Sequence, residues 1–280
     1  MSKIIIVGSS GFIGGAVARN LKSLKMNVIG IDRYRFDQIV LGKESIRALI
    51  SEEDSIIFTA AKVPVKTYGD YVVNLNLIKD FVNVIQDVNF AYLLNISSDA
   101  VYGDSLKPLK ESDNLDPTSL HGCMHFTRET ILNLEFPGKV GHLRPTLIFG
   151  RGDNHKGYGP NLFLQSISEL SSIKLFGKGE ELRDHIYIND VVKLVTKMEQ
   201  TKLAEPLNAA TGKVISFLDI ALILQKLVPD TEIDFLPRIF DKMPHNGFRE
   251  IDISKIKHLL PDFIPTDLTF ALTELVNTKA

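Results

Sequence analysis

Three glycines stand near the start of the chain at the spacing Gly8-x-x-Gly11-x-x-Gly14. They follow a short β-branched run, residues 3–7, and precede an apolar stretch of helical period that continues to Leu24. In a strand–turn–helix unit, such glycines permit a tight turn, let the backbone approach a pyrophosphate and let the helix pack on the strand. The helix N-terminus then offers free N–H groups and a favourable dipole to phosphate. The spacing therefore predicts a dinucleotide site.

An acid ends the next predicted strand, residues 27–31, about 20 residues beyond the glycines as such sites require. The carboxylate of Asp32 would accept a hydrogen bond from a ribose 2′-hydroxyl and repel a 2′-phosphate, which favours NAD over NADP. Arg33 and Arg35 weaken this preference, because either guanidinium can pair with a phosphate. A flavodoxin-like turn without a dinucleotide is the alternative, and the strand, helix and acid together favour the dinucleotide.

The elements that must position these residues follow from the alternation of apolar strand-like runs with helical patterns. This alternation predicts an α/β fold, with a Rossmann-like doubly wound parallel sheet covered on both faces. We expect strands at 3–7, 27–31, 55–60, 91–97 and 139–144, and helices at 12–25, 43–50, 70–87 and 118–135.

Small and polar residues follow two of the central strands. Ala60 and Ala61 end the third, where the chain can pass close to a cofactor. The fourth opens into Ser97-Ser98-Asp99, and ligands in such folds lie beyond the carboxyl ends of the strands. We therefore expect chemistry in this loop.

The composition of the sequence changes after Arg144-Pro145, because the apolar runs give way to a long polar loop at residues 150–160. Loops of this kind are usually functional or mobile. We expect a dinucleotide-binding domain over 1–150, to which the chain returns at about 185–210, and a smaller mixed α/β substrate domain over 151–280. In the latter, helices are expected at 161–171, at 217–228 behind a capping box at Ser216, and near 254–260.

Composition and charge exclude several classes of protein. A net charge of −2 over 280 residues gives no basic field for nucleic acid. No apolar run reaches the roughly 18 residues that span a bilayer, and no leader pattern precedes the first strand. A single cysteine, Cys123, excludes an internal disulfide. It fits a reducing compartment, so we expect a cytoplasmic protein without a membrane or nucleic-acid partner.

With these residues in view, the chain resembles the extended short-chain dehydrogenase/reductases, and more narrowly the nucleotide-sugar epimerase/dehydratase group. The resemblance covers essentially the whole chain. It rests on Gly8-x-x-Gly11-x-x-Gly14, Asp32, Ser97-Ser98-x-x-Val101-Tyr102-Gly103, Arg144-Pro145 with Phe149-Gly150, and Gly177-x-Gly179 with Arg183-Asp184-x-Ile186-Tyr187-x-x-Asp190.

The resemblance implies NAD(P) over the sheet and a nucleoside diphosphate sugar in the second domain. The cofactor contacts it implies are Gly8, Ser10, Gly11, Phe12, Ile13, Gly14, Asp32, Arg33, Ala60, Ala61, Ser97, His125 and Pro145. The substrate contacts it implies are Ser98, Tyr102, His155, Asn161, Arg183 and Arg249. Ser98 would bind the hydroxyl being oxidised, and Arg183 and Arg249 the diphosphate. The competing interpretations are a turn or cap hydroxyl for Ser98, solvated surface pairs for the arginines, and mere loop polarity for His155 and Asn161.

The chain departs from the family at the catalytic tyrosine and at the lysine four residues later, which are replaced by His121 and His125. Residues at i and i+4 share a helix face. A neutral imidazole, with an ordinary pKa of about 6.5, can serve as a base. One hypothesis makes His121 the acid/base, with His125 orienting the cofactor ribose or the neighbouring ring. The other makes both remnants of a site that has lost its oxidation chemistry. Zinc is disfavoured, because Cys123 points to another helix face, so no metal is expected.

Asp99 is a single acid followed by Ala100, whereas the resemblance implies an acidic pair in this loop for a dehydratase of the group. The main hypothesis is therefore an NAD-dependent, epimerase-type enzyme acting on a nucleoside diphosphate sugar, with Ser98, Asp99, His121 and His125 as its catalytic residues. The alternatives are a dehydratase or reductase of such a sugar, and a non-catalytic NAD(P)-binding sensor or subunit. The resemblance also implies a homodimer that pairs the helices 70–87 and 118–135.

Overall fold

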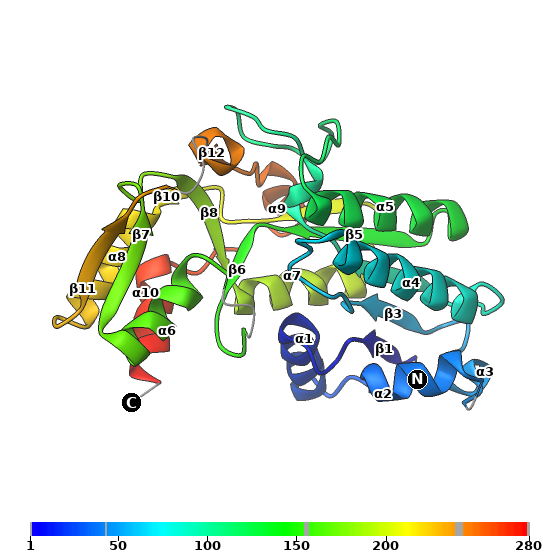
Figure 1. Ribbon diagram of the computed structural model, residues 1–280. Helices are drawn as coiled ribbons and strands as arrows, with labels where there is room; N and C mark the ends of the chain where they lie inside the picture. The colour runs from blue at the N-terminus through cyan, green and yellow to red at the C-terminus, as the bar shows by residue number, and fades with distance from the viewer. Residues whose placement is uncertain (1, 43, 154–156, 239–242, 279–280) are drawn as a thin grey trace. The chain divides into compact units, whose positions relative to one another are not determined.

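The structure of the protein is a computed structural model that describes residues 2–42, 44–153, 157–238 and 243–278 (Figure 1). The chain forms two compact units. The first consists of Met1–Tyr102, Asn114–Pro145 and Val191–Leu207, and the second of Gly103–Asp113, Thr146–Asp190 and Asn208–Ala280.

The first unit is built on a six-stranded sheet in the order β2-β1-β3-β4-β5-β9. Its strands are β1 (Ile4–Val7), β2 (Val28–Ile31), β3 (Ser55–Phe58), β4 (Tyr92–Ile96), β5 (Val140–Pro145) and β9 (Pro206–Ala209). The neighbouring pairs from β2 through β5 are parallel. Every residue of β1, β3 and β4 is buried, as expected for strands covered on both faces. The predicted fold class is confirmed.

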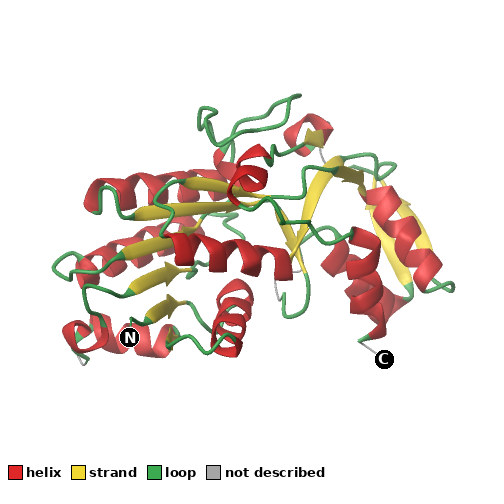
Figure 2. Ribbon diagram, turned by 180° about the vertical axis from the view of Figure 1, so that it is seen from behind, coloured by secondary structure: helices red, strands yellow, loops and turns green. Residues whose placement is uncertain are grey.

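Helices pack on both faces of this sheet. They are α1 (Phe12–Ser23), α2 (Arg33–Val40), α3 (Ile46–Leu49), α4 (Tyr68–Ile85), α5 (Leu120–Glu135) and α7 (Ile188–Thr201), with the short 3₁₀ helix η1 (Asp99–Val101) after β4. On one face α4 and α5 lie side by side, and the Tyr71 hydroxyl is 2.9 Å from Thr127 Oγ1 (Figure 1). On the opposite face, seen in Figure 2, Asn20 of α1 donates to Thr196 of α7.

Two local features differ from expectation. Helix α2 was not expected; it begins because the carboxylate of Asp32 accepts a hydrogen bond from the backbone N–H of Arg35 at 2.9 Å. Of the helix expected over 43–50, only the single turn α3 forms, and residue 43 lies outside the described residues. By contrast, the long helix α4 begins at a full capping box formed by Thr67 and Asp70.

The second unit contains a sheet in the order β10-β8-β12, with β6 also paired to β8, and a two-stranded sheet of β11 and β7. Its strands are β6 (Leu147–Phe149), β7 (Ser172–Phe176), β8 (Leu182–Tyr187), β10 (Val214–Ser216), β11 (Glu232–Leu236) and β12 (Phe248–Arg249). Its helices are α6 (Pro160–Leu170), α8 (Phe217–Leu227), η2 (Pro244–Gly247), α9 (Ser254–Leu259) and α10 (Leu268–Asn277). The predicted cap is confirmed: Ser216 Oγ accepts from the N–H of Asp219 at 2.9 Å.

Candidate functional site

The turn between β1 and α1 is as tight as its glycines predict. Gly8 has a φ of +94°, and a Cβ there would lie 2.6 Å from Thr59 Oγ1 and 2.8 Å from the backbone nitrogen of Ala60. A Cβ on Gly14 would lie 2.2 Å from the carbonyl oxygen of Gly8. The two glycines therefore bring the turn against both helix α1 and the segment after β3.

The same turn leaves the start of α1 open to an anion. Gly11 is the N-cap of α1 and makes no side-chain cap. The first-turn N–H groups, which have no partner within a helix, are therefore not taken by a side chain. A Cβ on Gly11 would meet only the carbonyl oxygen of Gly8, at 3.3 Å. Open N–H donors and a backbone that can be approached closely fit a dinucleotide pyrophosphate.

Asp32 lies where the ribose-binding acid is expected, directly after β2. One of its oxygens holds the N–H of Arg35 and caps α2, and the side chain is exposed. The first helical residue, Arg33, is also exposed. The contact of Asp32 with a ribose remains a prediction, and a helix cap is compatible with it because a carboxylate has two oxygens.

Ser98 and Asp99 follow β4. Ser98 Oγ accepts from the N–H of Ala100 at 3.1 Å and so caps η1, which is the alternative interpretation of this serine. The same hydroxyl lies 3.4 Å from an oxygen of Asp99, whose side chain is buried. The serine is only half-buried. The cap orients the hydroxyl and leaves open its contact with a substrate.

Helix α5 brings the two histidines against this loop. Ser119 caps the helix by accepting from the N–H of Gly122 at 3.0 Å. A Cβ on Gly122 would lie 2.1 Å from the carbonyl oxygen of Ala100, so only glycine lets α5 approach η1 this closely. The rings of His121 and His125 meet edge to face, with centroids 4.7 Å apart. Ser98, Asp99 and the histidine pair thus belong to two elements in direct contact.

His125 is buried and bonded to a residue that the sequence analysis did not single out. Its Nδ1 lies 3.1 Å from Nη2 of Arg128. Arginine only donates, so Nδ1 accepts and a neutral ring carries its proton on Nε2. Burial, and then the charges of Arg128 and His121, lower the pKa of His125 well below its ordinary value. His125 therefore cannot act as the cation that the family's lysine supplies.

Arg128 holds the ends of two strands. Its Nη1 donates to the carbonyl of Ala60 at 3.1 Å, its Nη2 donates to the carbonyl of Ile96, and its guanidinium lies over the ring of Phe58. Burial lowers the pKa of Arg128 to about 10, so it remains a cation at neutral pH. The only signal in the sequence was an arginine three residues after His125, on the helix face that the histidines must share.

A second buried cation, Arg144 of β5, is bonded to helix α5 and to Tyr102 after η1. Arg144 binds Glu129 through two hydrogen bonds, Nε to Oε1 at 3.0 Å and Nη2 to Oε2 at 2.6 Å. Its Nη1 also donates to the hydroxyl of Tyr102 at 2.9 Å. Burial would raise the pKa of Glu129, but the bonds from Arg144 outweigh it and the pKa is lowered. Tyr102 is fully buried, so its observed role is to support Arg144, and its contact with a substrate stays a prediction.

In the second unit, strand register brings together the two arginines predicted to bind a diphosphate. β12 runs parallel to β8 with Arg249 opposite Arg183, and both side chains are buried. Residues opposite each other in a parallel pair lie on the same face of the sheet. Arg249 Nη1 lies 4.0 Å from Asp104 Oδ1 and 2.9 Å from His245 Nδ1, so it already has partners within the second unit. The register places two guanidinium groups on one face of the sheet, and their contact with a diphosphate stays a prediction.

The remaining predicted substrate residues lie in or beside the loop before α6. Asn161 Oδ1 accepts from the N–H of Gly150 at 3.0 Å, and its Nδ2 donates to Asp153 at 2.5 Å, so its side chain orders this loop. His155 lies outside the described residues. Neither observation tests a contact with substrate.

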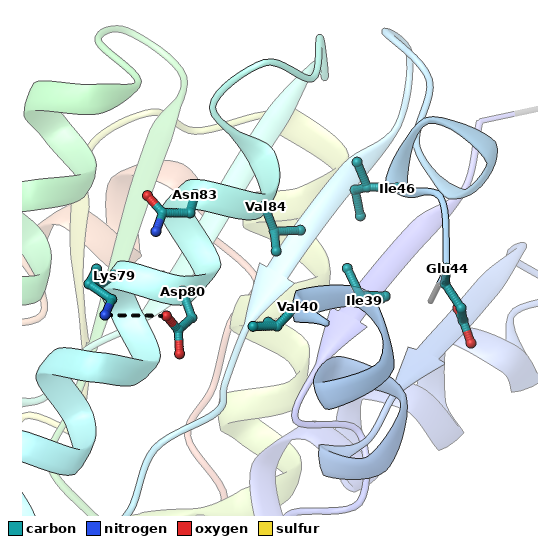
Figure 3. A pocket seen from close by; sticks show the side chains of 8 residues that line it. All are labelled: Ile39, Val40, Glu44, Ile46, Lys79, Asp80, Asn83 and Val84. Atoms are coloured by element: carbon teal, nitrogen blue, oxygen red, sulfur yellow. Dashed lines mark ion pairs between the residues drawn. The ribbon is translucent and has the colours of Figure 1, made fainter. Parts of the chain in front are cut away.

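A pocket in the first unit involves none of these residues. It is lined by side chains of α2, α3, α4 and the segment between α2 and α3, and contains the ion pair between Lys79 and Asp80 at 3.7 Å (Figure 3). Its lining residues are Ile39, Val40, Glu44, Ile46, Lys79, Asp80, Asn83 and Val84. The candidate site is therefore the carboxyl edge of the sheet and not this pocket.

Two features are absent from the described residues. No group of three or more histidine, cysteine, aspartate or glutamate side chains there is placed to hold a metal ion. Within the same ranges, none of the helices has the length and apolar character needed to cross a bilayer.

Comparisons with known proteins agree with this geometry. The model of the NAD dependent epimerase/dehydratase family matches residues 4–210. UDP-glucuronic acid decarboxylase 4 of Arabidopsis thaliana is 24% identical over 297 residues, which are 92% of this chain and 64% of that relative. The uncharacterized UDP-glucose epimerase YtcB of Bacillus subtilis (strain 168) is 24% identical over 306 residues, 97% of this chain and 96% of the relative.

A solved structure extends the comparison to three dimensions. UDP-glucuronic acid 4-epimerase from Bacillus cereus, in complex with UDP-glucuronic acid and NAD, has a TM-score of 0.84 to this chain at 21% identity. The similarity covers 99% of this chain and 100% of that one. At this identity the likeness establishes the fold, and it agrees with the predicted class.

Proposed function

Because the chain belongs to the NAD dependent epimerase/dehydratase family, we propose that it is an epimerase-type enzyme that uses NAD to modify a nucleoside diphosphate sugar. The observation that carries the proposal is that the glycine turn, the Ser98–Asp99 loop and the histidine pair all lie at the carboxyl edge of the sheet. The uncapped start of α1 fits a pyrophosphate, and the Ser98–Asp99 loop lies against the helix that carries His121 and His125. The named relatives include a UDP-glucose epimerase and a UDP-glucuronic acid decarboxylase.

The contacts of Ala60 connect the two parts of this edge. Gly8 approaches its backbone nitrogen, and Arg128 binds its carbonyl while also binding His125. The glycine turn and the histidine pair are therefore linked through one residue after β3. This proximity supports assigning the turn to the phosphates of NAD and the histidines to the reacting end.

We assign the proton transfer to His121. When bound, NAD would supply a transient hydride acceptor for the sugar. The sugar hydroxyl would give its proton to His121 as its carbon loses the hydride and becomes a carbonyl carbon, and return of the proton to the oxygen and of the hydride to the opposite face of that carbonyl would give the epimer. Ser98 holds the hydroxyl oxygen, and the buried carboxylate of Asp99 assists through its contact with Ser98. A neutral imidazole needs no neighbouring cation to lower its pKa into the working range, which a tyrosine does.

Recognition of the two ligands is assigned to charged side chains. Asp32 favours NAD over NADP, because a carboxylate after β2 accepts from a ribose hydroxyl and repels a 2′-phosphate. Arg183 and Arg249, paired across β8 and β12, are assigned to the diphosphate of the substrate. Arginine suits this task because its fork of donors matches phosphate oxygens.

Mass spectrometry of the ligands released on denaturation tests the proposal. The wild-type protein, incubated with NAD and a panel of nucleoside diphosphate sugars, should release NAD and one such sugar. The variant Arg183→Met should release NAD alone, and the exposed-site control Arg47→Met should behave as wild type. Release of NAD alone from the wild type would instead support the non-catalytic sensor.

Proton NMR of the same mixtures then identifies the reaction. An epimerase gives a product isomeric with the substrate, a dehydratase gives one that has lost water, and a reductase consumes a stoichiometric reduced cofactor. If no sugar in the panel changes with NAD or NADH present, the enzymatic proposal fails.

The remaining proposals concern the oligomeric state of the enzyme and its cellular compartment. We propose a homodimer formed through α4 and α5, because these neighbouring helices expose apolar side chains. The exposed residues are Tyr68, Val73, Leu120, Phe126 and Leu134. The single cysteine and the cofactor are consistent with a cytoplasmic enzyme.

A further inference from the structure

Arg128 is a buried cation whose positive charge is not neutralised by a paired carboxylate. Its side chain is 3% exposed. Its hydrogen bonds run to the carbonyls of Ala60 and Ile96 and to His125. The adjacent acid, Glu129, is instead bound through both oxygens by Arg144. Within the described ranges no acid forms an ion pair with Arg128, and its Nε–H has no acceptor there.

The positive charge of Arg128 lies where ligands bind in parallel sheets of this kind. Ala60 and Ile96 mark the carboxyl ends of the neighbouring parallel strands β3 and β4, where ligands bind in such sheets. The guanidinium carbon lies over the ring of Phe58, 5.2 Å from the ring centroid. That ring in turn stacks on Phe81, with ring centroids 4.2 Å apart. A buried cation is costly unless its surroundings or its function compensate. Here the carbonyls satisfy two of its nitrogens and leave its net charge at the edge of the sheet.

We propose that Arg128 is a positioning residue that replaces the missing lysine in two ways: it supplies the buried positive charge, and it fixes His125 as the Nε2–H tautomer. His125 then donates from Nε2 and cannot accept a proton on Nδ1. His121 is consequently the ring that is left to take the proton of the substrate. The catalytic part of this inference rests on the proposed function, whereas the tautomer part depends on the contact alone.

The geometry explains why the charge does not sit at position 125. An imidazolium there would face the guanidinium at 3.1 Å in a buried place, and like charges so close repel strongly. Arg128 approaches from one helical turn later and binds the carbonyls of Ala60 and Ile96 at the strand ends. The chain thus divides the lysine's roles between a charge-bearing arginine and a neutral histidine.

Nitrogen-15 NMR of the histidine rings tests the tautomer directly, without substrate. Long-range correlations should show His125 with a bare Nδ1 and a protonated Nε2 in the wild type, with the signal assigned by its loss in His125→Phe. In Arg128→Met the fraction of the Nε2–H tautomer should fall toward that of a free neutral imidazole. The control Arg47→Met, an exposed arginine, should leave it unchanged. An unchanged tautomer in folded Arg128→Met would overturn the positioning part.

A conservative variant covers the case in which Arg128→Met fails to fold. Arg128→Lys keeps the charge, but one ammonium cannot reproduce the planar fork that holds two carbonyls and the imidazole. Circular dichroism verifies the fold. We expect Arg128→Lys to relax the tautomer preference of His125. Full retention of the preference would also overturn the positioning part.

The pH dependence of turnover tests the charge. Arg128 is bonded to His125, whose ring meets that of His121 with centroids 4.7 Å apart, so its charge acts on His121 from one ring away. Removing this charge should raise the pKa of His121 and move the acid limb of kcat/KM to higher pH in Arg128→Met, by up to about one unit. In Arg128→Lys the limb should stay in place while kcat falls at least tenfold and KM for the sugar is retained. An unmoved limb in Arg128→Met would overturn the charge part.

These readouts separate the two proposals. If no nucleoside diphosphate sugar is turned over but the tautomer depends on Arg128, the proposed function fails and the positioning of His125 stands. If the wild type turns over a sugar and Arg128→Met has an unchanged tautomer and pH profile, the present inference fails and the proposed function stands.

Discussion

His121 and His125 are adjacent, but their surroundings assign them different tasks. His125 is buried and bonded through Nδ1 to a guanidinium, whereas His121 is only partly buried. An acid/base must exchange its proton with a ligand, which burial and a permanent donor at Nδ1 prevent for His125. The two imidazoles are therefore not interchangeable, and His121 is the one that we propose for proton transfer.

Replacing His121 with phenylalanine should abolish turnover while NAD is still bound. The ring volume is largely kept, but the proton acceptor is lost, and such a group typically contributes a factor of about 10² to 10⁴. Steady-state kinetics measures the turnover, and the fluorescence of added NADH measures binding of the cofactor. The control is His258→Gln, an exposed histidine of α9. Activity retained in folded His121→Phe would remove His121 from the mechanism.

A third histidine, His142, has a structural role that predicts a pH effect. It lies within β5, with Nδ1 3.1 Å from Asn95 Nδ2 and Nε2 2.9 Å from Asn133 Oδ1. Burial lowers its pKa to about 4. The unfolded chain, with a pKa near 6.5, binds more protons between these values. The free energy of unfolding should therefore fall as pH drops from about 6.5 to 4, by about 3 kcal/mol in all from this group.

Urea unfolding at several pH values checks this prediction. The variant His142→Gln, although less stable at neutral pH, should lose less of its stability on acidification than the wild type. His258→Gln should keep the wild-type slope, because that side chain is exposed. Parallel pH profiles for wild type and His142→Gln would contradict the assignment.

Sequence reasoning located the glycines, the strand-end residues and the histidine pair, because local spacing and the order of elements determine where these lie. It missed Arg128 and Gly122, whose importance depends on what they meet across the fold. Gly122 matters because of the carbonyl of Ala100, and Arg128 because of the carbonyls of Ala60 and Ile96. The pairing of Arg183 with Arg249 likewise depends on a register between strands far apart in sequence.

Among the elements, the contact of α5 with η1 does most to bring the predicted residues together. Gly122→Ala would place a methyl group 2.1 Å from the carbonyl oxygen of Ala100 and push the helix from the loop. We expect a loss of about 1–3 kcal/mol in stability and a sharp loss of activity. Thermal unfolding and kinetics give the two values.

The matched control is Gly69→Ala in the first turn of α4. A Cβ there would have its nearest neighbour, Thr67 Oγ1, at an ordinary 3.7 Å. This variant should be neutral or more stable by up to about 1 kcal/mol, because alanine favours a helix. If both substitutions had the same effect, the close approach of α5 to η1 would not be the cause.

Strand β5 is joined to α5 by the pair of Arg144 and Glu129. Glu129→Gln would leave the guanidinium buried without its charge partner, at a cost of about 3–5 kcal/mol in unfolding free energy. Urea unfolding measures this cost, and the exposed Glu135→Gln at the end of the same helix should change little. A small loss for Glu129→Gln would show that the helix does not depend on this bond.

At the scale of the whole molecule, the exposed apolar residues of α4 and α5 predict the state of assembly. Phe126→Glu combined with Leu134→Glu should convert a dimer, at twice the chain mass of 31.2 kDa, to a monomer. Light scattering after gel filtration measures the mass. Leu106→Glu, an exposed leucine of the second unit, should leave it unchanged. A monomeric wild type would rule out the proposed pairing.

The short distance between Arg128 and His125 also limits which substitutions these positions can accept. A lysine at 125 would introduce a second permanent charge beside the guanidinium, so we expect a tyrosine at 121 and a lysine at 125 not to be tolerated while Arg128 is kept. Positions 121, 125 and 128 must be exchanged together. The three positions are therefore coupled, and a graft of tyrosine at 121 and lysine at 125 should also replace the arginine with a small neutral side chain.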